Sequence, residues 1–96
     1  MYEVRLSRAA ARSCRALTDR TRAAVRSALE RLASEVERPQ HRMGKRVKTI
    51  KGVSVTFHRL RVGDHLAMFD VIHEDRVILV LGIVHRRDLE CWLRSR

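Results

Sequence analysis

The sequence predicts an α+β domain with an N-terminal strand, an antiparallel helix hairpin, a three-strand antiparallel meander that forms one sheet, and a short C-terminal helix. Two observations support this class. Apolar residues follow a helical spacing up to about residue 37 and a strand-like pattern from Gly52 onward. With 96 residues, the chain is long enough to bury one modest core between these two parts. We therefore expect a single domain over residues 1–96.

The N-terminal half predicts one strand and two helices. Residues 2–7, YEVRLS, alternate apolar and charged side chains as a half-buried strand does. Ser7 can cap a first, Ala-rich helix, and a break at residues 17–20 offers Thr18 or Asp19 as the next cap. The second helix should reach about Glu37 and end before Pro39. The apolar stripes of the two helices contain Ala10, Cys14 and Leu17, and then Val25, Leu29, Leu32 and Val36.

The C-terminal half predicts the meander in three segments, VSVTFHRLR, HLAMFDVI and RVILVLGIV. Gly63 and Asp64 suit a two-residue type II′ turn, which fixes the pairing of the first two strands. That register places six side chains on one face, in the pairs Arg61–Leu66, Arg59–Met68 and Phe57–Asp70. The opposite face, which includes His58, should lie beneath the helices. Residues 77–84 should form a central strand, and residues 87–94 a short helix or an irregular tail.

The charge of the chain indicates a polyanionic partner. Lys and Arg number 21 against 11 Asp and Glu, which gives a net charge of +10 and a pI near 11.3. Arginine dominates, and guanidinium groups bind phosphates in bidentate fashion, so nucleic acid fits best. An acidic protein would also satisfy this charge, and a merely solvated basic surface is the remaining alternative.

The cysteines and the apolar segments exclude several other classes. Cys14 and Cys91 lack the spacing of a zinc site or of a disulfide framework, so we expect no metal and a cytoplasmic location. The N-terminus has no apolar core of a signal peptide. The longest apolar run, residues 77–84, is too short to span a bilayer, so we expect no membrane partner.

Three segments resemble one family when they are taken in order. RPQHRMGKRVKTIKG is similar to a Pro-then-Lys-Leu-Lys-Gly connection, FHRLRVGDHLAMFDV to an Arg-x-Gly-x-Tyr-Arg hairpin, and VILVLGIVHRRDLE to a last strand that ends in His-Arg-Arg-Asp. These motifs resemble the RelE/ParE superfamily of bacterial type II toxins, and the resemblance covers essentially the whole chain. The RelE-like branch is favoured.

The resemblance implies a toxin that inhibits translation by ribosome-dependent mRNA cleavage. Such an enzyme is a metal-independent endoribonuclease, or mRNA interferase, that needs no cofactor. Its partners would be the ribosome and mRNA, a cognate acidic antitoxin, and operator DNA bound through the antitoxin complex. Two alternatives stay open. The first is a ParE-like toxin without nuclease activity that inhibits DNA gyrase, and the second is a catalytically degenerate member that only binds an antitoxin.

The resemblance also assigns catalytic residues. Arg59, Arg61 and Arg86 are the expected phosphate-binding groups, with Arg86 the strongest match, and His85 or Glu90 would move protons. The sequence departs from the family pattern at two positions. The hairpin arginine that contacts the scissile phosphate falls on Leu66, and the terminal tyrosine falls on Glu90 or Trp92. His65 is a further candidate for proton transfer, because histidine titrates near neutral pH.

Two further groups of residues complete the expected sites. The expected RNA-binding residues are Lys45, Arg46, Lys48, Lys51, Arg87 and Trp92. The alternatives are a solvated loop for the lysine-rich run and an anchor of the C-terminal helix for Trp92. Phe57, Leu66 and Met68 would form an exposed apolar patch that contacts the antitoxin. The same face could instead be packed beneath the C-terminal segment.

Overall fold

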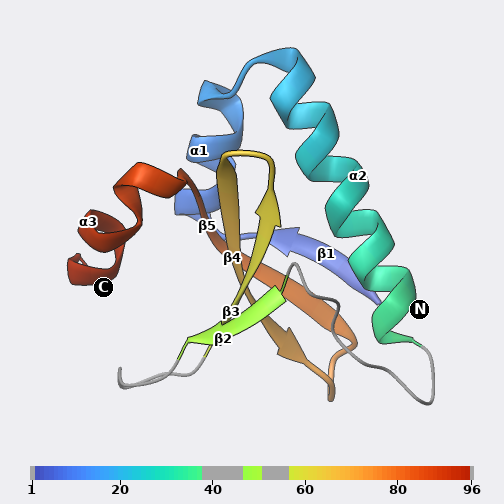
Figure 1. Ribbon diagram of the computed structural model, residues 1–96. Coiled ribbons are helices and arrows are strands. Elements are labelled where there is room, and N and C mark those ends of the chain that lie inside the picture. Colours follow the sequence, from blue (N-terminus) through green and yellow to red (C-terminus); the bar gives the residue numbers. More distant parts are fainter. Residues whose placement is uncertain (1, 38–46, 51–56, 96) are drawn as a thin grey trace.

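The computed structural model describes residues 2–37, 47–50 and 57–95. Its described strands form one five-stranded sheet in the order β1-β5-β4-β3-β2 (Figure 1). β1 (Glu3–Leu6) pairs in parallel with β5 (Val77–His85), and all other neighbours are antiparallel. β3 (Phe57–Val62) and β4 (His65–Ile72) form the central hairpin, and β2 (Val47–Ile50) lies at the edge. The predicted α+β class is confirmed.

Two helices cover one face of the sheet. Ser7 caps α1 (Arg8–Ala16) by accepting a hydrogen bond from the N–H of Ala10 at 3.1 Å, and Thr18 caps α2 (Asp19–Val36) through the N–H of Thr21 at 3.2 Å. The main core lies between these helices and the strands. It contains Ala10, Val25, Ala28, Leu29, Leu32, Ala33, Val36, Leu60, Ala67, Phe69, Ile78, Val80 and Ile83.

The hairpin register is as the turn residues predict. Val62 lies opposite His65, Arg61 opposite Leu66, and Arg59 opposite Met68. Gly63 occupies the first central position of the turn and has a φ of +60°. A type II′ turn requires a positive φ at this position, and residues with a Cβ rarely adopt one. This ladder places alternate residues of β3 on opposite faces of the sheet.

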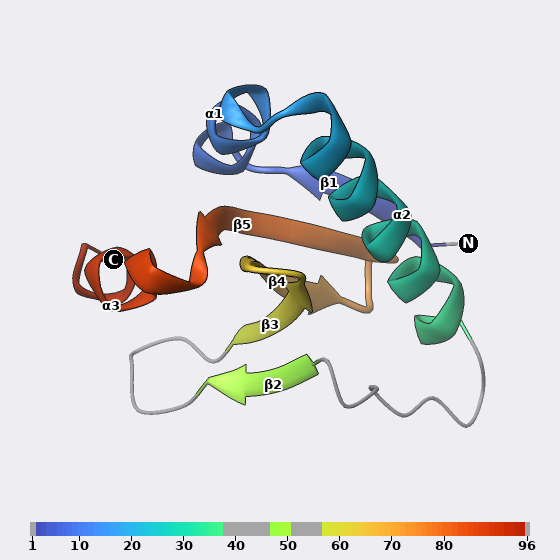
Figure 2. The same ribbon diagram turned by 45° about the horizontal axis from the view of Figure 1, so that its top comes forward.

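The C-terminal segment is helical. A 3₁₀ turn (Arg86–Asp88) leads from β5 into α3 (Leu89–Arg94). Figure 2 shows α3 set apart from α1 and α2, beyond the end of β5. Its apolar side chains close a second, smaller core around Phe57, Leu66 and Met68 on the other face of the sheet. The helices thus cover both faces.

Two features of the sheet differ from the prediction. The segment expected to be a basic connection contains an edge strand, β2, in which Lys48 lies opposite Arg59. The first strand of the meander was expected from Val53, but residues 53–56 lie outside the described part. β5 also contains a bulge, because Met68 pairs with Gly82 while Phe69 pairs with Val80. Residues 77–84 show no simple alternation because both faces of β5 are covered, one by α1 and α2 and the other by α3.

Candidate functional site

The end of β5 and the β3–β4 turn are joined at one end of the sheet. The backbone N–H of Arg86 donates to the carbonyl of Asp64 at 2.8 Å. The Arg86 Nε lies 3.8 Å from the Asp64 Oδ1, and both side chains are more than 60% exposed. The main-chain hydrogen bond therefore fixes where Arg86 leaves the sheet, while its guanidinium remains in contact with solvent.

Three exposed arginines gather beside this junction. Arg61 donates from Nε to the carbonyl of Gly63 at 3.2 Å, which holds its side chain along the turn. Arg87 follows Arg86 directly and is exposed. A guanidinium carries five N–H donors, so the described contacts leave most of the donors of these arginines available to an anion. We call Arg61, His65, His85, Arg86 and Arg87 the basic rim.

The two histidines of the basic rim lie opposite each other in the β4–β5 ladder. Their ring centroids are 5.3 Å apart, in an edge-to-face arrangement. The His85 Nδ1 accepts a hydrogen bond from the backbone N–H of Arg87 at 3.2 Å. This bond places the proton of the neutral His85 ring on Nε2. His85 therefore caps the 3₁₀ turn, and its Nε2–H is the ring group that can donate a hydrogen bond.

Arg59 and Glu90 lie farther from this cluster. Arg59 is half-buried in β3, two residues before Arg61 and on the same face. Glu90 is exposed in the first turn of α3, and in the described part of the chain its carboxylate has no hydrogen bond or ion pair. Of the predicted catalytic set, Arg61 and Arg86 thus each contact the β3–β4 turn, and His85 directly precedes Arg86; no described contact links Arg59 or Glu90 to this turn.

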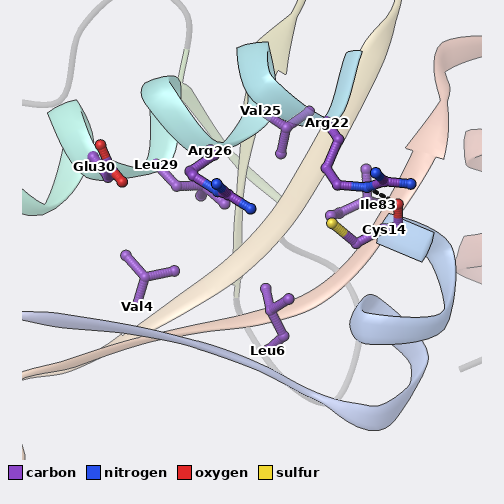
Figure 3. A pocket seen from close by; sticks show the side chains of 9 residues that line it. All are labelled: Val4, Leu6, Cys14, Arg22, Val25, Arg26, Leu29, Glu30 and Ile83. Carbon is purple, nitrogen blue, oxygen red and sulfur yellow. Dashed lines mark hydrogen bonds between the residues drawn. The ribbon is translucent and has the colours of Figure 1, made fainter. Parts of the chain in front are cut away.

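A cavity of about 280 Å³ lies on the helix side of the sheet (Figure 3). Val4 and Leu6 of β1 face α2 across it, and Cys14 points into it from α1. Arg22 lines the same cavity and binds the end of α1, donating to the carbonyls of Cys14, Arg15 and Leu17 at 2.9–3.1 Å. The sequence did not predict this cavity. Leu6, at the end of β1, lines it and is 41% exposed.

Comparison with known proteins identifies the family. Residues 4–90 match the family described as the ParE toxin of the type II toxin–antitoxin system parDE. The chain belongs to this family. No curated protein sequence was found to match the toxin.

Solved structures of RelE toxins share the fold of the toxin. The RelBE2 toxin–antitoxin complex from Mycobacterium tuberculosis is 23% identical with a TM-score of 0.71, over 88% of this chain and 98% of that chain. The archaeal RelE–RelB complex from Pyrococcus horikoshii is 22% identical with a TM-score of 0.63, over 88% and 94%. The isolated Escherichia coli RelE toxin is 18% identical with a TM-score of 0.60 and is covered in full, as is this chain. These likenesses confirm the RelE/ParE superfamily fold.

The apolar patch expected to contact an antitoxin is not exposed in the toxin. Phe57, Leu66 and Met68 are at most 5% exposed, because Leu89, Trp92 and Leu93 of the C-terminal segment pack against them. The prediction of an open patch is therefore wrong for this conformation, and the alternative of a face packed beneath the C-terminal segment is correct. Leu66 lies in this core, so it cannot reach a phosphate.

Trp92 is held against the sheet. Its ring meets Phe57 edge to face at a centroid distance of 5.5 Å, and it packs directly over Gly82, where a Cβ would lie 2.5 Å from the indole Nε1. The indole therefore anchors α3, and its expected role in RNA binding is not supported by this geometry. Lys45, Arg46 and Lys51 of the same expected set lie outside the described residues.

His58 lies on the face of the sheet that α1 and α2 cover. His58 is half-buried beside the ring of Phe69, and desolvation by burial lowers its pKa from 6.5, although the charge of Asp70 opposes this shift. Its expected place on the helix face is confirmed.

In the part of the toxin that the structure describes, no cluster of three or more His, Cys, Asp or Glu side chains could hold a metal ion. No described helix combines the length and the apolar character that a membrane crossing requires.

Proposed function

We propose that this type II toxin inhibits translation by cleaving mRNA on the ribosome, with the scissile phosphate bound at the basic rim. The observation that carries the proposal is the position of Arg61 and Arg86. Both guanidiniums are exposed next to the Gly63–Asp64 turn, Arg61 on the face that α3 covers, and the His65–His85 pair lies one rung away on the face that α1 and α2 cover. Cations that stabilise the charge on the phosphoryl oxygens and side chains that move protons are the parts that phosphodiester cleavage needs.

The proposed reaction uses the 2′-hydroxyl of the mRNA as the nucleophile. His65 removes the proton of the 2′-hydroxyl, and the oxygen attacks the adjacent phosphorus. Arg61 and Arg86 stabilise the negative charge that grows on the phosphoryl oxygens. The bond from phosphorus to the 5′-oxygen breaks. His85 enters this step as the imidazolium, with its Nδ1 released from the N–H of Arg87, and it becomes neutral when it gives its Nε2 proton to that oxygen. The products are a 2′,3′-cyclic phosphate and a 5′-hydroxyl. Glu90 is the second candidate for proton transfer, and Arg59 and Lys48 extend the proposed path of the RNA along β3 and β2.

A second candidate is inhibition of DNA gyrase without nuclease activity. Two observations favour it. The family that the chain matches over residues 4–90 is the ParE toxin, and Leu66 is buried where the RelE pattern has an arginine. The single tyrosine of the chain is Tyr2, so the C-terminal tyrosine of many RelE-like nucleases has no equivalent here. A degenerate protein that only binds an antitoxin would share these features.

The proposed partners follow from the charge and from the comparisons. The structures from M. tuberculosis and P. horikoshii are toxin–antitoxin complexes, so we propose a cognate antitoxin for this chain. Because the chain has a net charge of +10, we propose that the antitoxin is acidic, so that the two proteins attract each other. We further propose that the complex binds operator DNA through the antitoxin, and that the free toxin acts in the cytoplasm on ribosomes and mRNA.

One experiment separates the candidates. The purified toxin is added to a reconstituted translation reaction, and mRNA 5′ ends are mapped with and without ribosomes. Cuts that require ribosomes and disappear in Arg86→Ala support the proposal, provided that Arg20→Ala, which removes an exposed arginine of α2, still cuts. No cuts by folded toxin, together with loss of supercoiling by purified gyrase, would establish the second candidate. A folded toxin that does neither would indicate the degenerate binding protein.

A further inference from the structure

The solvent face of α1 consists of arginine and alanine alone. Arg8, Arg12 and Arg15 are exposed at spacings of four and three residues, and the other exposed residues of this helix are Ala9 and Ala16. Side chains at these spacings lie on one side of a helix, spread over a rise of about 10 Å. We call Arg8, Arg12 and Arg15 the arginine stripe.

The arginine stripe has no acidic compensation. α1 contains no Asp or Glu, and no described acidic group forms an ion pair with these arginines. The solvent face of α2 is different, because Asp19 and Glu30 lie among its exposed arginines. Mixed charges are typical of an ordinary solvated helix, and a face of one sign is typical of a surface that meets an opposite charge.

The arginine stripe does not stabilise its own helix. Like charges four residues apart destabilise a helix by roughly 0.2–0.5 kcal/mol per pair. Arg8 lies in the first turn, where the helix dipole is positive and disfavours a cation. A face that costs local stability in this way is better explained by an external ligand than by folding.

The arginine stripe lies near the basic rim. Ser7, at the start of α1, donates from its backbone to the carbonyl of Val80 and from its hydroxyl to the carbonyl of Leu81. α1 therefore lies against the half of β5 that leads to Arg86 and Arg87, and Figure 2 shows it above that part of the strand. A ligand several nucleotides long could touch both surfaces.

We propose that the arginine stripe binds the sugar-phosphate backbone of RNA, as a surface separate from the basic rim. The choice of RNA rests on the proposed function. The choice of a nucleic acid over an acidic protein rests on the face itself. Stable protein interfaces need large apolar or aromatic anchors at their centre, and this face has none. Guanidinium groups bind phosphate oxygens in bidentate geometry. The exposed alanines, Ala9 and Ala16, are small, so they leave room for a nucleic-acid backbone beside the arginines.

The test compares two triple variants of equal charge. Arg8→Gln, Arg12→Gln and Arg15→Gln are combined in one variant, and Arg20→Gln, Arg26→Gln and Arg31→Gln in the control. Glutamine is a good helix former, so both helices should persist, which circular dichroism checks. Binding of a fluorescein-labelled single-stranded RNA is measured by anisotropy over a series of KCl concentrations. Single-stranded nucleic acid contributes a slope of about −0.7 in log K against log salt for each phosphate contacted.

For the α1 variant, the slope of log K against log salt should be less negative by about 2. This variant should also bind the RNA on the order of tenfold more weakly at physiological salt. The α2 control should keep nearly the slope of the unmodified toxin. Equal slopes in the two variants would overturn the inference, because binding would then follow net charge alone. Normal RNA binding by the α1 variant with lost binding of the cognate antitoxin would overturn it in favour of an acidic protein.

This measurement needs neither ribosomes nor cleavage, so its result can refute the arginine stripe without refuting the proposed function, and the reverse. A toxin that cuts mRNA on ribosomes but shows equal slopes keeps the proposed function and refutes the arginine stripe. A toxin that shows the α1-specific slope but inhibits gyrase refutes the proposed function. In that case the same titration with single-stranded DNA decides the ligand, and tighter binding of DNA than of RNA would overturn the choice of RNA.

Discussion

Substitution of Gly82 by alanine should push α3 away from the sheet. The new Cβ would lie 2.5 Å from the Trp92 Nε1 and 2.9 Å from its Cε2, closer than real Cβ contacts. The indole is rigid, and its other side meets Phe57, so relief requires movement of the helix that carries it. Overpacking of this kind costs about 1–3 kcal/mol of unfolding free energy. For a domain of this size, that lowers the Tm by roughly 4–8 °C per kcal/mol.

Fluorescence and thermal unfolding together measure this effect. Trp92 is the only tryptophan, so its emission reports on the α3 contact without interference. Gly82→Ala should shift the emission to longer wavelength as the indole meets water, and it should lower the Tm. Unchanged emission and unchanged Tm in the variant would refute the reasoning.

A double-mutant cycle tests whether the clash acts through the indole. Trp92→Ala alone should cost about 2.5 kcal/mol, because a half-buried indole removes roughly 100 Å² from water at about 25 cal/mol per Å². Without the indole, Gly82→Ala should become neutral or slightly stabilising, since alanine is preferred to glycine in a strand. The destabilisation by Gly82→Ala would therefore disappear or reverse in the Trp92→Ala background. Additive effects would show that Trp92 is not the obstacle.

Substitutions at Arg22, Gly63 and His58 test contacts that stabilise the fold of the toxin, with Arg22→Lys and Asp64→Ala as controls. Arg22→Ala should lower the unfolding free energy by about 1–3 kcal/mol, because carbonyls at the end of α1 lose their hydrogen-bond donors. Arg22→Lys should not restore the lost stability, since an ammonium group lacks the planar set of donors of a guanidinium. Urea unfolding measures both variants. Gly63→Ala should cost about 1–2 kcal/mol at a φ of +60°, whereas Asp64→Ala, next in the turn, should cost less by the same assay. Burial lowers the pKa of His58, so the unfolded chain binds more protons and stability falls as pH drops below 6.5. His58→Phe should flatten that part of the Tm profile, and an unchanged profile would contradict the assignment.

The sequence predicts the hairpin well because local chemistry decides it. Gly63 at the turn fixes the register, and a register fixed at one rung places every other side chain of β3 and β4 on a known face. The caps of α1 and α2 are predicted for the same reason, since Ser7 and Thr18 act on the residues directly after them. These features need no knowledge of distant parts of the chain.

The packing of α3 could not be predicted in the same way. Its position depends on Gly82, which leaves room for an indole ten residues later in the chain. The strand alternation predicts that Phe57, Leu66 and Met68 share a face, but it does not decide between a partner and the C-terminal segment as the cover of that face, and a partner was favoured. The edge strand β2 was missed because four residues that include Lys48 carry too little pattern to distinguish a strand from a basic loop.

Arg86 of the basic rim makes two contacts with Asp64, and the main-chain contact is the one that positions the residue. The Arg86–Asp64 ion pair is long and exposed, and such pairs contribute roughly 0–1 kcal/mol. The backbone hydrogen bond from Arg86 to Asp64 does not depend on either side chain, so it holds the two chain segments together whether or not the ion pair forms. A phosphate can therefore displace the Asp64 carboxylate at little cost while Arg86 keeps its place. The main chain therefore fixes where Arg86 leaves the sheet, and its guanidinium stays exposed to solvent whether or not the ion pair forms.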